Sequence, residues 1–313
     1  MHSAVQIVLA TFNGERFIRQ QLDSLVQQSY TDFTVLIRDD GSTDHTITII
    51  SEYQSKYPDK FFLLQDHLKN NSGAKGNFSL LLEKTTADYI FFCDQDDVWN
   101  DDKVAFELQK IKTLENGEQC YPCMVFSDMK VINESGIEIQ SSLWKLLHLH
   151  PDFFVLNRLL VQNIPHGCSM VINKAMRDLA CPIPEAAIMH DHWIALLAAS
   201  CGRWEAIATP SLRIRNHEEN VTRKQSSLLQ KIQRISKNLF SKKAYEYFFK
   251  IRVAQAEALL LQCGTLLNAD QIYLLNNFIT LSKTKGLARK KIIFRYKFYR
   301  TTFWHTLKMW LRA

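Results

Sequence analysis

The chain has 313 residues, of which 46% are hydrophobic and 22% are charged, a composition typical of a globular protein with a sizeable core. It contains no run of about 20 consecutive apolar residues, which argues against a transmembrane helix. The net charge of +6 arises from one end of the chain, because residues 283–313 contain ten Lys and Arg but no Asp or Glu. No basic and apolar leader precedes the first strand, and the seven cysteines lack metal-type spacing. We therefore expect a cytoplasmic protein with reduced thiols.

The first hundred residues alternate between strand-like and helix-like patterns. Strands are predicted at residues 5–10, 34–37, 61–65 and 89–93, and helices at residues 16–27, 46–57 and 77–84. This alternation predicts a parallel sheet with helices on both faces, a Rossmann-like α/β arrangement. Neither G-x-G-x-x-G nor G-x-x-x-x-G-K-[ST] is present, which disfavours ordinary NAD-dependent and P-loop enzymes.

The remaining chain divides into a second α/β part and a helical end. Strands are predicted at residues 124–126, 130–132, 168–172, 204–207 and 212–215, and helices at residues 103–114, 157–162 and 189–199. From about residue 226 only helical periodicity continues, at residues 227–240, 245–267 and 269–283. We therefore expect a domain of residues 1–223, with halves 1–100 and 101–223, followed by a helical extension of residues 224–313.

An acidic motif follows the predicted strand at residues 89–93. Asp94 and Asp96 of the sequence Asp-Gln-Asp-Asp would lie at the carboxyl edge of the sheet, where ligands bind in open α/β folds. Carboxylates this close repel one another, and a hard divalent cation with phosphate oxygens relieves that repulsion. The motif favours a Mg²⁺ or Mn²⁺ site that holds a diphosphate. The alternative is a solvated acidic turn before the helix at residues 103–114.

Four segments share their order and spacing with a known family: Ala-Thr-Phe-Asn-Gly-Glu at 10–15, Asp-Asp-Gly-Ser-Thr-Asp at 39–44, Asp-Gln-Asp-Asp at 94–97, and His-Asp-His-Trp at 190–193. Together they resemble the family 2 glycosyltransferases, which are inverting enzymes of the GT-A fold. The Asp-Gln-Asp-Asp-x-Trp sequence is most similar to the bacterial rhamnosyltransferase-like branch. The resemblance covers roughly residues 4–223, with residues 1–100 as the nucleotide-sugar-binding half and residues 101–223 as the acceptor half.

The resemblance implies roles for individual residues. The loop at residues 11–15 would wrap the nucleoside, Asp40 would accept hydrogen bonds from the base or ribose, and Asp39 would support it. The donor-binding set is expected to be Thr11, Asn13, Glu15, Asp39, Asp40, Lys75 and Asp94, with Lys75 near a phosphate.

The resemblance also implies a metal site and a catalytic base. Asp94, Asp96 and His217 would bind Mg²⁺ or Mn²⁺, and Asp191 would be the base. Inverting transfer is a single in-line displacement, which needs a carboxylate to deprotonate the acceptor hydroxyl and a Lewis acid at the departing diphosphate. His190 and His192 are not expected to share a metal, because adjacent helical residues point apart.

The acceptor site is expected near residues that flank the acidic motifs. Trp99 and Trp193 would either stack on sugar or brace the loops. His166 and Gly167 would line the acceptor site, or Gly167 would be a structural turn glycine.

The basic end of the chain interleaves cations with aromatic and aliphatic residues at 288–300. A basic amphipathic helix of this kind typically lies in a membrane interface. A helix packed on its own domain or on another copy, and a nucleic-acid contact, are the alternatives. We expect the inner membrane surface rather than nucleic acid, and therefore a peripheral location on the cytoplasmic membrane face.

The predicted function is metal-dependent, inverting transfer of a sugar, with rhamnose as a candidate, from a dTDP- or UDP-linked donor. The expected acceptor is a hydroxyl of a surface polysaccharide or of a polyprenyl-linked glycan, on family analogy. One alternative is a nucleotidyltransferase, which would usually carry a Gly-rich, basic loop after the first strand. The other is a non-catalytic carbohydrate- or membrane-binding module.

Overall fold

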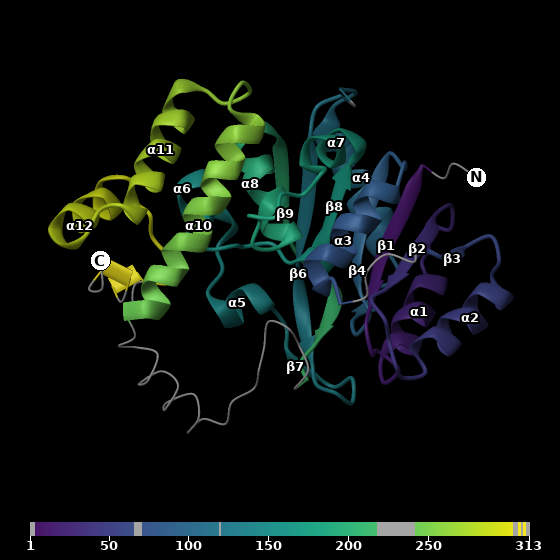
Figure 1. The fold of residues 1–313 in the computed structure, drawn as a ribbon. Helices are drawn as coiled ribbons and strands as arrows, with labels where there is room; N and C mark the ends of the chain where they lie inside the picture. The colour runs from purple at the N-terminus through teal and green to yellow at the C-terminus, as the bar shows by residue number, and fades with distance from the viewer. Residues whose placement is uncertain are drawn as a thin grey trace.

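The computed structural model describes residues 4–65, 71–118, 120–217, 242–302, 306–307 and 309–310. Its described part is built on a nine-stranded mixed sheet with the order β3-β2-β1-β4-β8-β6-β9-β5, and β7 pairs with β6 (Figure 1). The strands are β1 Val5–Thr11, β2 Thr34–Asp39, β3 Phe61–Leu63, β4 Tyr89–Asp94, β5 Val98–Trp99, β6 Cys123–Ile132, β7 Glu138–Gln140, β8 Met170–Asn173 and β9 Arg203–Arg215.

The first four strands form the predicted parallel half of the sheet. The register aligns Thr11 with Asp39, and Ala10 with Asp94. The ends of β1, β2 and β4 therefore meet at one edge, and this brings three of the sequence motifs together. The helices of this half are α1 Ile18–Val26, α2 Thr46–Lys56 and α3 Gly73–Lys84, whereas α4 Lys103–Glu115 packs mainly on β6, β8 and β9 of the second half.

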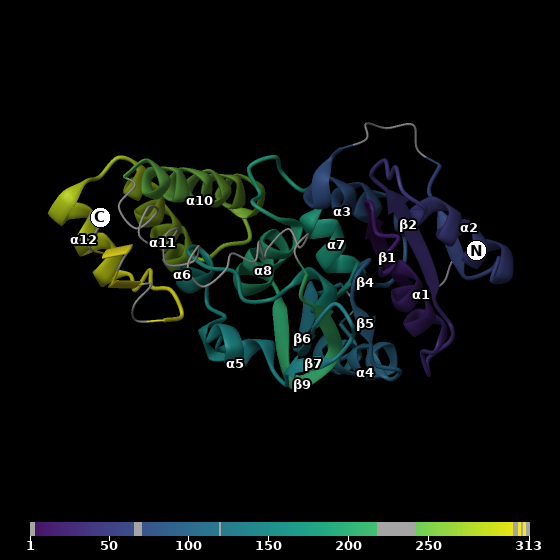
Figure 2. The ribbon, with the colours of Figure 1, turned by 90° about the horizontal axis from the view of Figure 1, so that it is seen from below.

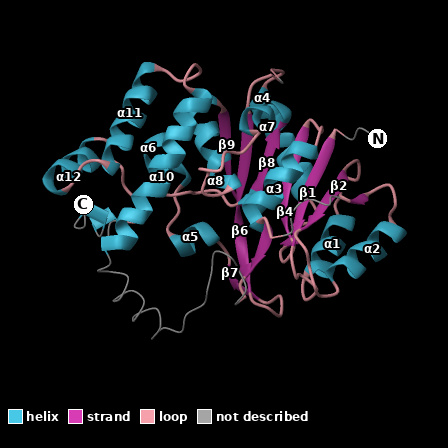
Figure 3. Ribbon diagram, viewed as in Figure 1, coloured by secondary structure: helices cyan, strands magenta, loops and turns pink. Residues whose placement is uncertain are grey.

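Two hydrophobic cores cover the two faces of the sheet, because alternate residues of each strand point to opposite sides. Ile7 packs in one core with residues of α1, α2 and α4, whereas Val8 packs in the other with residues of α3. Figure 3 shows helices on both faces of the strands. The expected Rossmann-like layering is confirmed for this half.

The second half differs from the prediction in the length of its strands. The expected pairs of short strands form two long strands, β6 and β9, which run parallel to each other with a register shift between Ser127 and Met129. Between these pairs β6 has one residue and β9 has the four residues 208–211, so the irregularity lengthens β9 without ending the pairing. β8 lies antiparallel between β4 and β6 and joins the two halves.

The remaining helices cover the second half and the C-terminal end. They are α5 Leu143–Leu147, α6 Leu156–Leu159, α7 Lys174–Ala180, α8 His190–Cys201, α10 Lys242–Cys263, α11 Ala269–Ile279 and α12 Gly286–Arg295, with short 3₁₀ turns at Pro151–Phe153, Gly167–Ser169 and Thr280–Ser282.

The C-terminal helices pack on the α/β part through a shared core. Phe249 and Leu259 of α10 belong to the same buried cluster as Trp193 and Leu197 of α8. The Gln255 side chain also accepts a hydrogen bond from the backbone N–H of Ile188 at 2.7 Å. Figure 2 shows α10, α11 and α12 beyond α8, at the end of the molecule opposite β2 and α2.

Two sequence expectations fall outside the described residues, namely the helix at 227–240 and the domain boundary at 223–226. Across the ranges that the structure describes, no helix combines the length and apolar character needed to cross a bilayer. All seven cysteines are free.

Candidate active site

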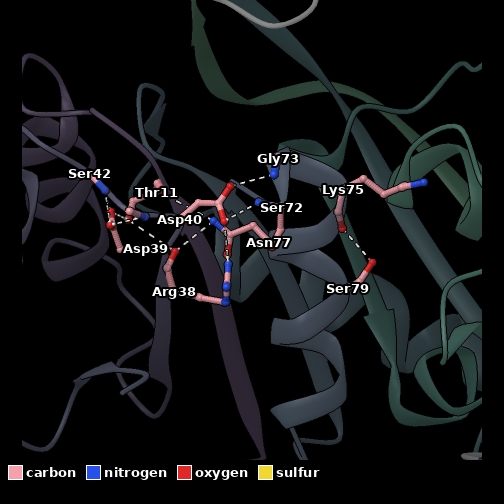
Figure 4. Close-up of polar contacts among 11 residues, drawn as sticks. Thr11, Arg38, Asp39, Asp40, Ser42, Ser72, Gly73, Lys75, Asn77 and Ser79 are labelled. Atoms are coloured by element: carbon pink, nitrogen blue, oxygen red, sulfur yellow. Dashed lines mark hydrogen bonds and ion pairs between the residues drawn. The ribbon is translucent and has the colours of Figure 1, made fainter. Parts of the chain in front are cut away.

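Asp39, at the end of β2, ties two loops together. Its Oδ1 accepts hydrogen bonds from the backbone N–H groups of Gly41 (2.9 Å) and Ser42 (2.7 Å). Its Oδ2 accepts from Thr11 Oγ1 at 2.8 Å (Figure 4). A carboxylate with several fixed donors is held in one orientation. Asp39 and Thr11 therefore fix the ends of β2 and β1 relative to each other.

Asp40 is buried and performs a similar task for α3. Its Oδ1 accepts from the Ser72 N–H at 2.9 Å, and its Oδ2 from the Gly73 N–H at 2.7 Å. The buried Arg38 guanidinium bonds both Asp40 Oδ1 and Asn77 Oδ1 at 3.2 Å (Figure 4). The carboxylate thus anchors the start of α3 at the strand edge. A contact between Asp40 and a nucleoside stays a prediction.

Lys75 points away from the Asp39 and Asp40 cluster (Figure 4). Its Nζ donates to the backbone carbonyls of Glu185 (2.8 Å) and Ala187 (2.9 Å). The side chain joins α3 to the segment before α8, so the expected phosphate contact is not the arrangement found. The position of Lys75 near the predicted donor loop in the sequence did not indicate that its ammonium group donates to two backbone carbonyls.

The loop at residues 11–15 is crosslinked to the loop after β2. Asn13 has a positive φ of 46°, and its Oδ1 accepts from the Thr43 N–H at 2.8 Å. Glu15 Oε2 accepts from the His45 N–H at 2.9 Å and lies 2.8 Å from His45 Nδ1. Both side chains therefore shape the loop from within. Their contact with a donor remains a prediction.

Gln95, between the two carboxylates of the acidic motif, was not singled out by sequence reasoning. Its Oε1 accepts from the Phe12 N–H, and its Nε2 donates to the Phe12 carbonyl, both at 2.8 Å. A Cβ added to Gly14 would lie 2.3 Å from Gln95 Oε1. A larger residue at position 14 would therefore collide with the Gln95 amide, which lies against the glycine. The pairing links the acidic motif directly to the loop at residues 11–15.

This pairing predicts a non-additive stability effect. Gln95→Ala removes two hydrogen bonds and should lower the free energy of unfolding by about 1–3 kcal/mol. Gly14→Ala should destabilise the protein in the wild-type background but much less in the Gln95→Ala background, because the clash is then gone. Urea denaturation of the two single variants and the double variant measures a coupling of about 0.5–3 kcal/mol. Strictly additive effects would contradict the contact.

Asp94 and Asp97 form the acidic centre of the site with the Cys168 thiol. One ligand-type atom from each lies within 4.8 Å of the others. Burial, together with the charges of Asp96 and Asp191, raises the pKa of Asp94 to about 7. Burial also raises the pKa of Asp97 well above its usual range. The site therefore holds more carboxylate charge than it can keep ionised at neutral pH without a cation.

Asp96 and His217 are brought together from distant parts of the chain. His217 Nε2 lies 2.7 Å from Asp96 Oδ2, and both side chains are largely buried. Carboxylate oxygens with one imidazole nitrogen suit Mg²⁺ or Mn²⁺. A divalent cation would also relieve the repulsion that raises the pKa of Asp94. Among the described residues, however, the three ligand atoms that lie within 4.8 Å of one another belong to Asp94, Asp97 and Cys168. A metal site formed by Asp94, Asp96 and His217 together stays a prediction.

Asp191 lies in the first turn of α8 and is partly exposed. Its Oδ1 accepts a hydrogen bond from the His192 N–H at 2.6 Å. Burial raises the pKa of Asp191 to about 6, although the nearby backbone N–H groups and the Asn163 side chain act in the opposite direction. Such a carboxylate is ionised at neutral pH and is a stronger base than an ordinary aspartate. The charge of Asp191 also raises the pKa of Asp94, so the two carboxylates are close enough to interact electrostatically.

The histidines beside Asp191 do not form a metal site with it. His190 is 3% exposed, and its ring lies between Phe78 and Phe92, with centroids 4.1 and 5.4 Å away. Burial lowers the pKa of His190 to about 3. His192 Nε2 lies 2.7 Å from a backbone carbonyl of α6. The expectation that these two histidines point apart is confirmed.

His190 also restricts the neighbouring loop. A Cβ added to Gly167 would lie 2.7 Å from His190 Nε2. The ring thus limits position 167 to glycine, and the Gly167 backbone N–H lies near enough to Asp191 to lower the pKa of its carboxyl. Gly167 and the adjacent His166 lie beside Asp191, and their contact with an acceptor stays a prediction.

The prediction that Trp99 and Trp193 stack on an acceptor sugar is wrong. Both side chains are 0% exposed. The Trp193 Nε1–H donates to a carbonyl at the end of α7 at 3.2 Å, and the Trp99 ring packs beside Phe91 and under the Lys103 ammonium. Both indoles brace the core next to the acidic segments, which was the alternative role.

The strand order, the donor-side loops and the paired acidic sites together define a GT-A glycosyltransferase. The chain matches the profile described as Glycosyl transferase family 2 over residues 6–179, more than half of its length, and it belongs to this family. This membership disfavours the nucleotidyltransferase alternative.

Curated relatives and solved structures agree with this assignment. The chain is 35% identical over 121 residues to the dTDP-rhamnosyl transferase RfbG of Shigella flexneri, covering 38% of this chain and 41% of RfbG. It is 32% identical over 94 residues to the putative glycosyltransferase EpsE of Bacillus subtilis, covering 30% of this chain and 33% of EpsE. The chain thus spans less than half of the length of each of these two relatives.

Two solved structures share the fold at low sequence identity. S. aureus TarS 1–349 in complex with UDP-GlcNAc superposes with a TM-score of 0.59 and 16% identity, covering 95% of this chain and 80% of TarS 1–349. The mannosyltransferase PcManGT of Pyrobaculum calidifontis, in complex with GDP-Man and Mn²⁺, superposes with a TM-score of 0.50 and 15% identity. The match covers 99% of this chain and 85% of the PcManGT chain. The expected GT-A α/β fold is confirmed.

Proposed function

We propose that this glycosyltransferase uses Asp191 as the base in an inverting transfer from a nucleotide-sugar donor. The observation that carries the proposal is the electrostatic interaction of Asp94 and Asp191, in which the charge of one raises the pKa of the other. One acid lies on the motif assigned to the donor diphosphate, and the other lies at the start of α8. The placement of the two acids on different elements suits an in-line displacement, in which the acceptor hydroxyl attacks from the side opposite the leaving group.

Asp191 is suited to remove the acceptor proton. Its pKa of about 6 keeps it ionised at neutral pH while making it more basic than a solvated aspartate. The hydrogen bond from the His192 N–H orients the carboxylate, which stays partly exposed. A fixed base of this kind reduces the reorganisation needed at the moment of proton transfer.

Asp94, Asp96 and His217 would hold Mg²⁺ or Mn²⁺. Such a cation supplies Lewis-acid stabilisation of the departing diphosphate. The Mn²⁺ in the PcManGT complex supports this choice of cofactor, as does the close approach of His217 Nε2 and Asp96 Oδ2. Asp39 and Gln95 would position the nucleotide loop without contributing to the chemical step.

The donor is proposed to be dTDP- or UDP-linked, with rhamnose as the candidate sugar. The similarity to a dTDP-rhamnosyl transferase supports a dTDP-linked donor and rhamnose as its sugar. The fold shared with a UDP-GlcNAc-binding enzyme supports a UDP-linked donor. The acceptor is proposed to be a hydroxyl of a surface polysaccharide or of a polyprenyl-linked glycan. The basic C-terminal segment would place the enzyme on the cytoplasmic face of the membrane.

The proposed function is tested by nucleoside-diphosphate release from a panel of dTDP-, UDP- and GDP-sugars, with Mn²⁺ or with EDTA. Slow hydrolysis of one donor in Mn²⁺, lost in EDTA, is the expected result and names the sugar. Hydrolysis that persists in EDTA would contradict metal dependence. Absence of both turnover and Mn²⁺-dependent nucleotide binding across the panel would contradict the donor assignment.

A further inference from the structure

A cavity of about 690 Å³ lies at the C-terminal end of the molecule. It is lined by side chains of α12, by residues of the 151–158 segment, and by the chain that follows α12. Figures 1 and 2 both place α12 and the C-terminus at the end of the molecule opposite β2 and α2. The cavity is therefore separate from the strand edge that carries Asp39 and Asp94.

The wall of this cavity is mostly apolar. Phe153, Phe294, Leu307 and Trp310 contribute to it. Phe294 is 70% exposed and the neighbouring Leu287 is 77% exposed. α12 is thus packed on one side only, because its Ile293 and Arg289 are buried in the domain while this face is open. Exposed aromatic and aliphatic side chains around a hollow are typical of a ligand or interaction site.

Four cations surround the apolar wall: Arg158, Lys290, Lys291 and Arg300. Within the ranges that the structure describes, none of the four forms an ion pair with a carboxylate, and residues 283–313 contain no Asp or Glu. The Arg300 Nε–H donates only to the neutral Gln162 amide, at 3.3 Å, and burial lowers the pKa of Arg300. Uncompensated cations beside an apolar hollow favour a ligand with an anionic head and an apolar tail.

We propose that this cavity binds one anionic phospholipid of the bilayer, with its phosphate among the four cations and the end of an acyl chain against Phe294 and Trp310. Arg provides fork-shaped donors for phosphate oxygens, whereas Lys provides a point charge. The inference rests on the membrane-surface part of the proposed function and is independent of the transfer reaction. The residues that line the cavity, rather than the whole basic segment, would then form the lipid-binding site.

Vesicle flotation of the full chain tests this site, using phosphatidylcholine vesicles with and without phosphatidylglycerol. Lys290→Gln/Lys291→Gln should lower binding to the anionic vesicles about 30-fold, since each cation near an anionic surface contributes about 1 kcal/mol. The matched control Lys283→Gln/Lys285→Gln removes the same charge from exposed positions outside the cavity and should change binding less than about threefold. Equal losses in both variants would mean a diffuse basic surface and would overturn the site.

The apolar part is tested separately. Leu287→Ser/Phe294→Ser should weaken vesicle binding, whereas Leu261→Ser/Leu266→Ser, which alters two exposed leucines of similar character, should not. Soluble short-chain phosphatidylglycerol should compete with vesicles, and inorganic phosphate at the same concentration should not. Competition by phosphate alone would indicate a simple anion site and overturn the lipid. No flotation of the wild type would overturn both the site and membrane attachment, whereas donor hydrolysis would report independently on transfer.

Discussion

Replacing Asp191 with Asn is expected to abolish sugar transfer while leaving the fold and donor binding intact. The amide cannot accept the proton of the acceptor hydroxyl, and loss of a general base lowers the rate by about 10²–10⁴-fold. The Asn side chain keeps the size of the original, and its amide oxygen can accept the hydrogen bond that the His192 N–H donates to Asp191. Initial rates with a saturating donor, compared with the wild type, measure the effect.

The pH profile provides a second readout of Asp191. Because its pKa is raised to about 6, the wild type should lose kcat/KM as the pH falls below 6 and the base becomes protonated. In Asp191→Asn the residual rate should lack this limb. The exposed Asp178 forms only surface ion pairs, so Asp178→Asn is the matched control and should keep both rate and profile. Near-normal turnover in Asp191→Asn would overturn the assignment of the base.

Replacing Asp96 with Ala is expected to weaken metal-dependent nucleotide binding. The change removes one carboxylate of the proposed metal site and leaves His217 without its partner at 2.7 Å. Even residues that only orient metal ligands cost about 10–100-fold in affinity when they are lost, so a direct ligand should cost at least as much. Titration calorimetry with a nucleoside diphosphate in Mn²⁺ measures the loss.

Control measurements distinguish the loss of metal binding in Asp96→Ala from a general loss of folding. In EDTA, wild type and Asp96→Ala should bind the nucleotide equally weakly. The exposed Asp101 lies five residues along the chain, and Asp101→Ala should bind as the wild type does in both conditions. An unchanged Mn²⁺-dependent affinity in Asp96→Ala would contradict its role as a ligand.

The parallel half of the fold was predictable because local pattern and tertiary arrangement agree there. Apolar runs such as residues 89–93 become buried strands, and predicted helical segments such as residues 77–84 become helices that cover the parallel strands. The second half was less predictable. The breaks expected at residues 127–129 and 208–211 are bulges inside long strands, and pairing with a neighbour, which the local sequence does not encode, keeps those strands continuous.

The candidate site was predictable in its acids but not in its contacts. The structure pairs Asp96 with His217 and places the charge of Asp191 near enough to Asp94 to raise its pKa, while their roles in transfer stay predictions. By contrast, Lys75 is engaged by two carbonyls, because a helix-packing partner more than 100 residues away was invisible in the local sequence. Gln95 was missed for the same reason, since its partner Phe12 is 83 residues distant.

The tryptophans show a further limit of reasoning from sequence position. Trp99 and Trp193 lie beside acidic motifs in the chain, yet both are fully buried. A large aromatic side chain removes about 150–250 Å² of surface from water, so the core competes with the site for such residues. Adjacency along the chain does not decide that competition, because neighbouring residues on a strand or helix point in different directions.

The anomeric configuration of the first-formed product tests the central claim most directly. Proton NMR at early time, before mutarotation, distinguishes the two anomers of the sugar released from the identified donor or attached to an acceptor. A single displacement assisted by Asp191 predicts a product of inverted configuration, formed by the wild type and lost in Asp191→Asn. A product of retained configuration would require a covalent intermediate or a front-face route, and would contradict Asp191 as the base of an inverting transferase.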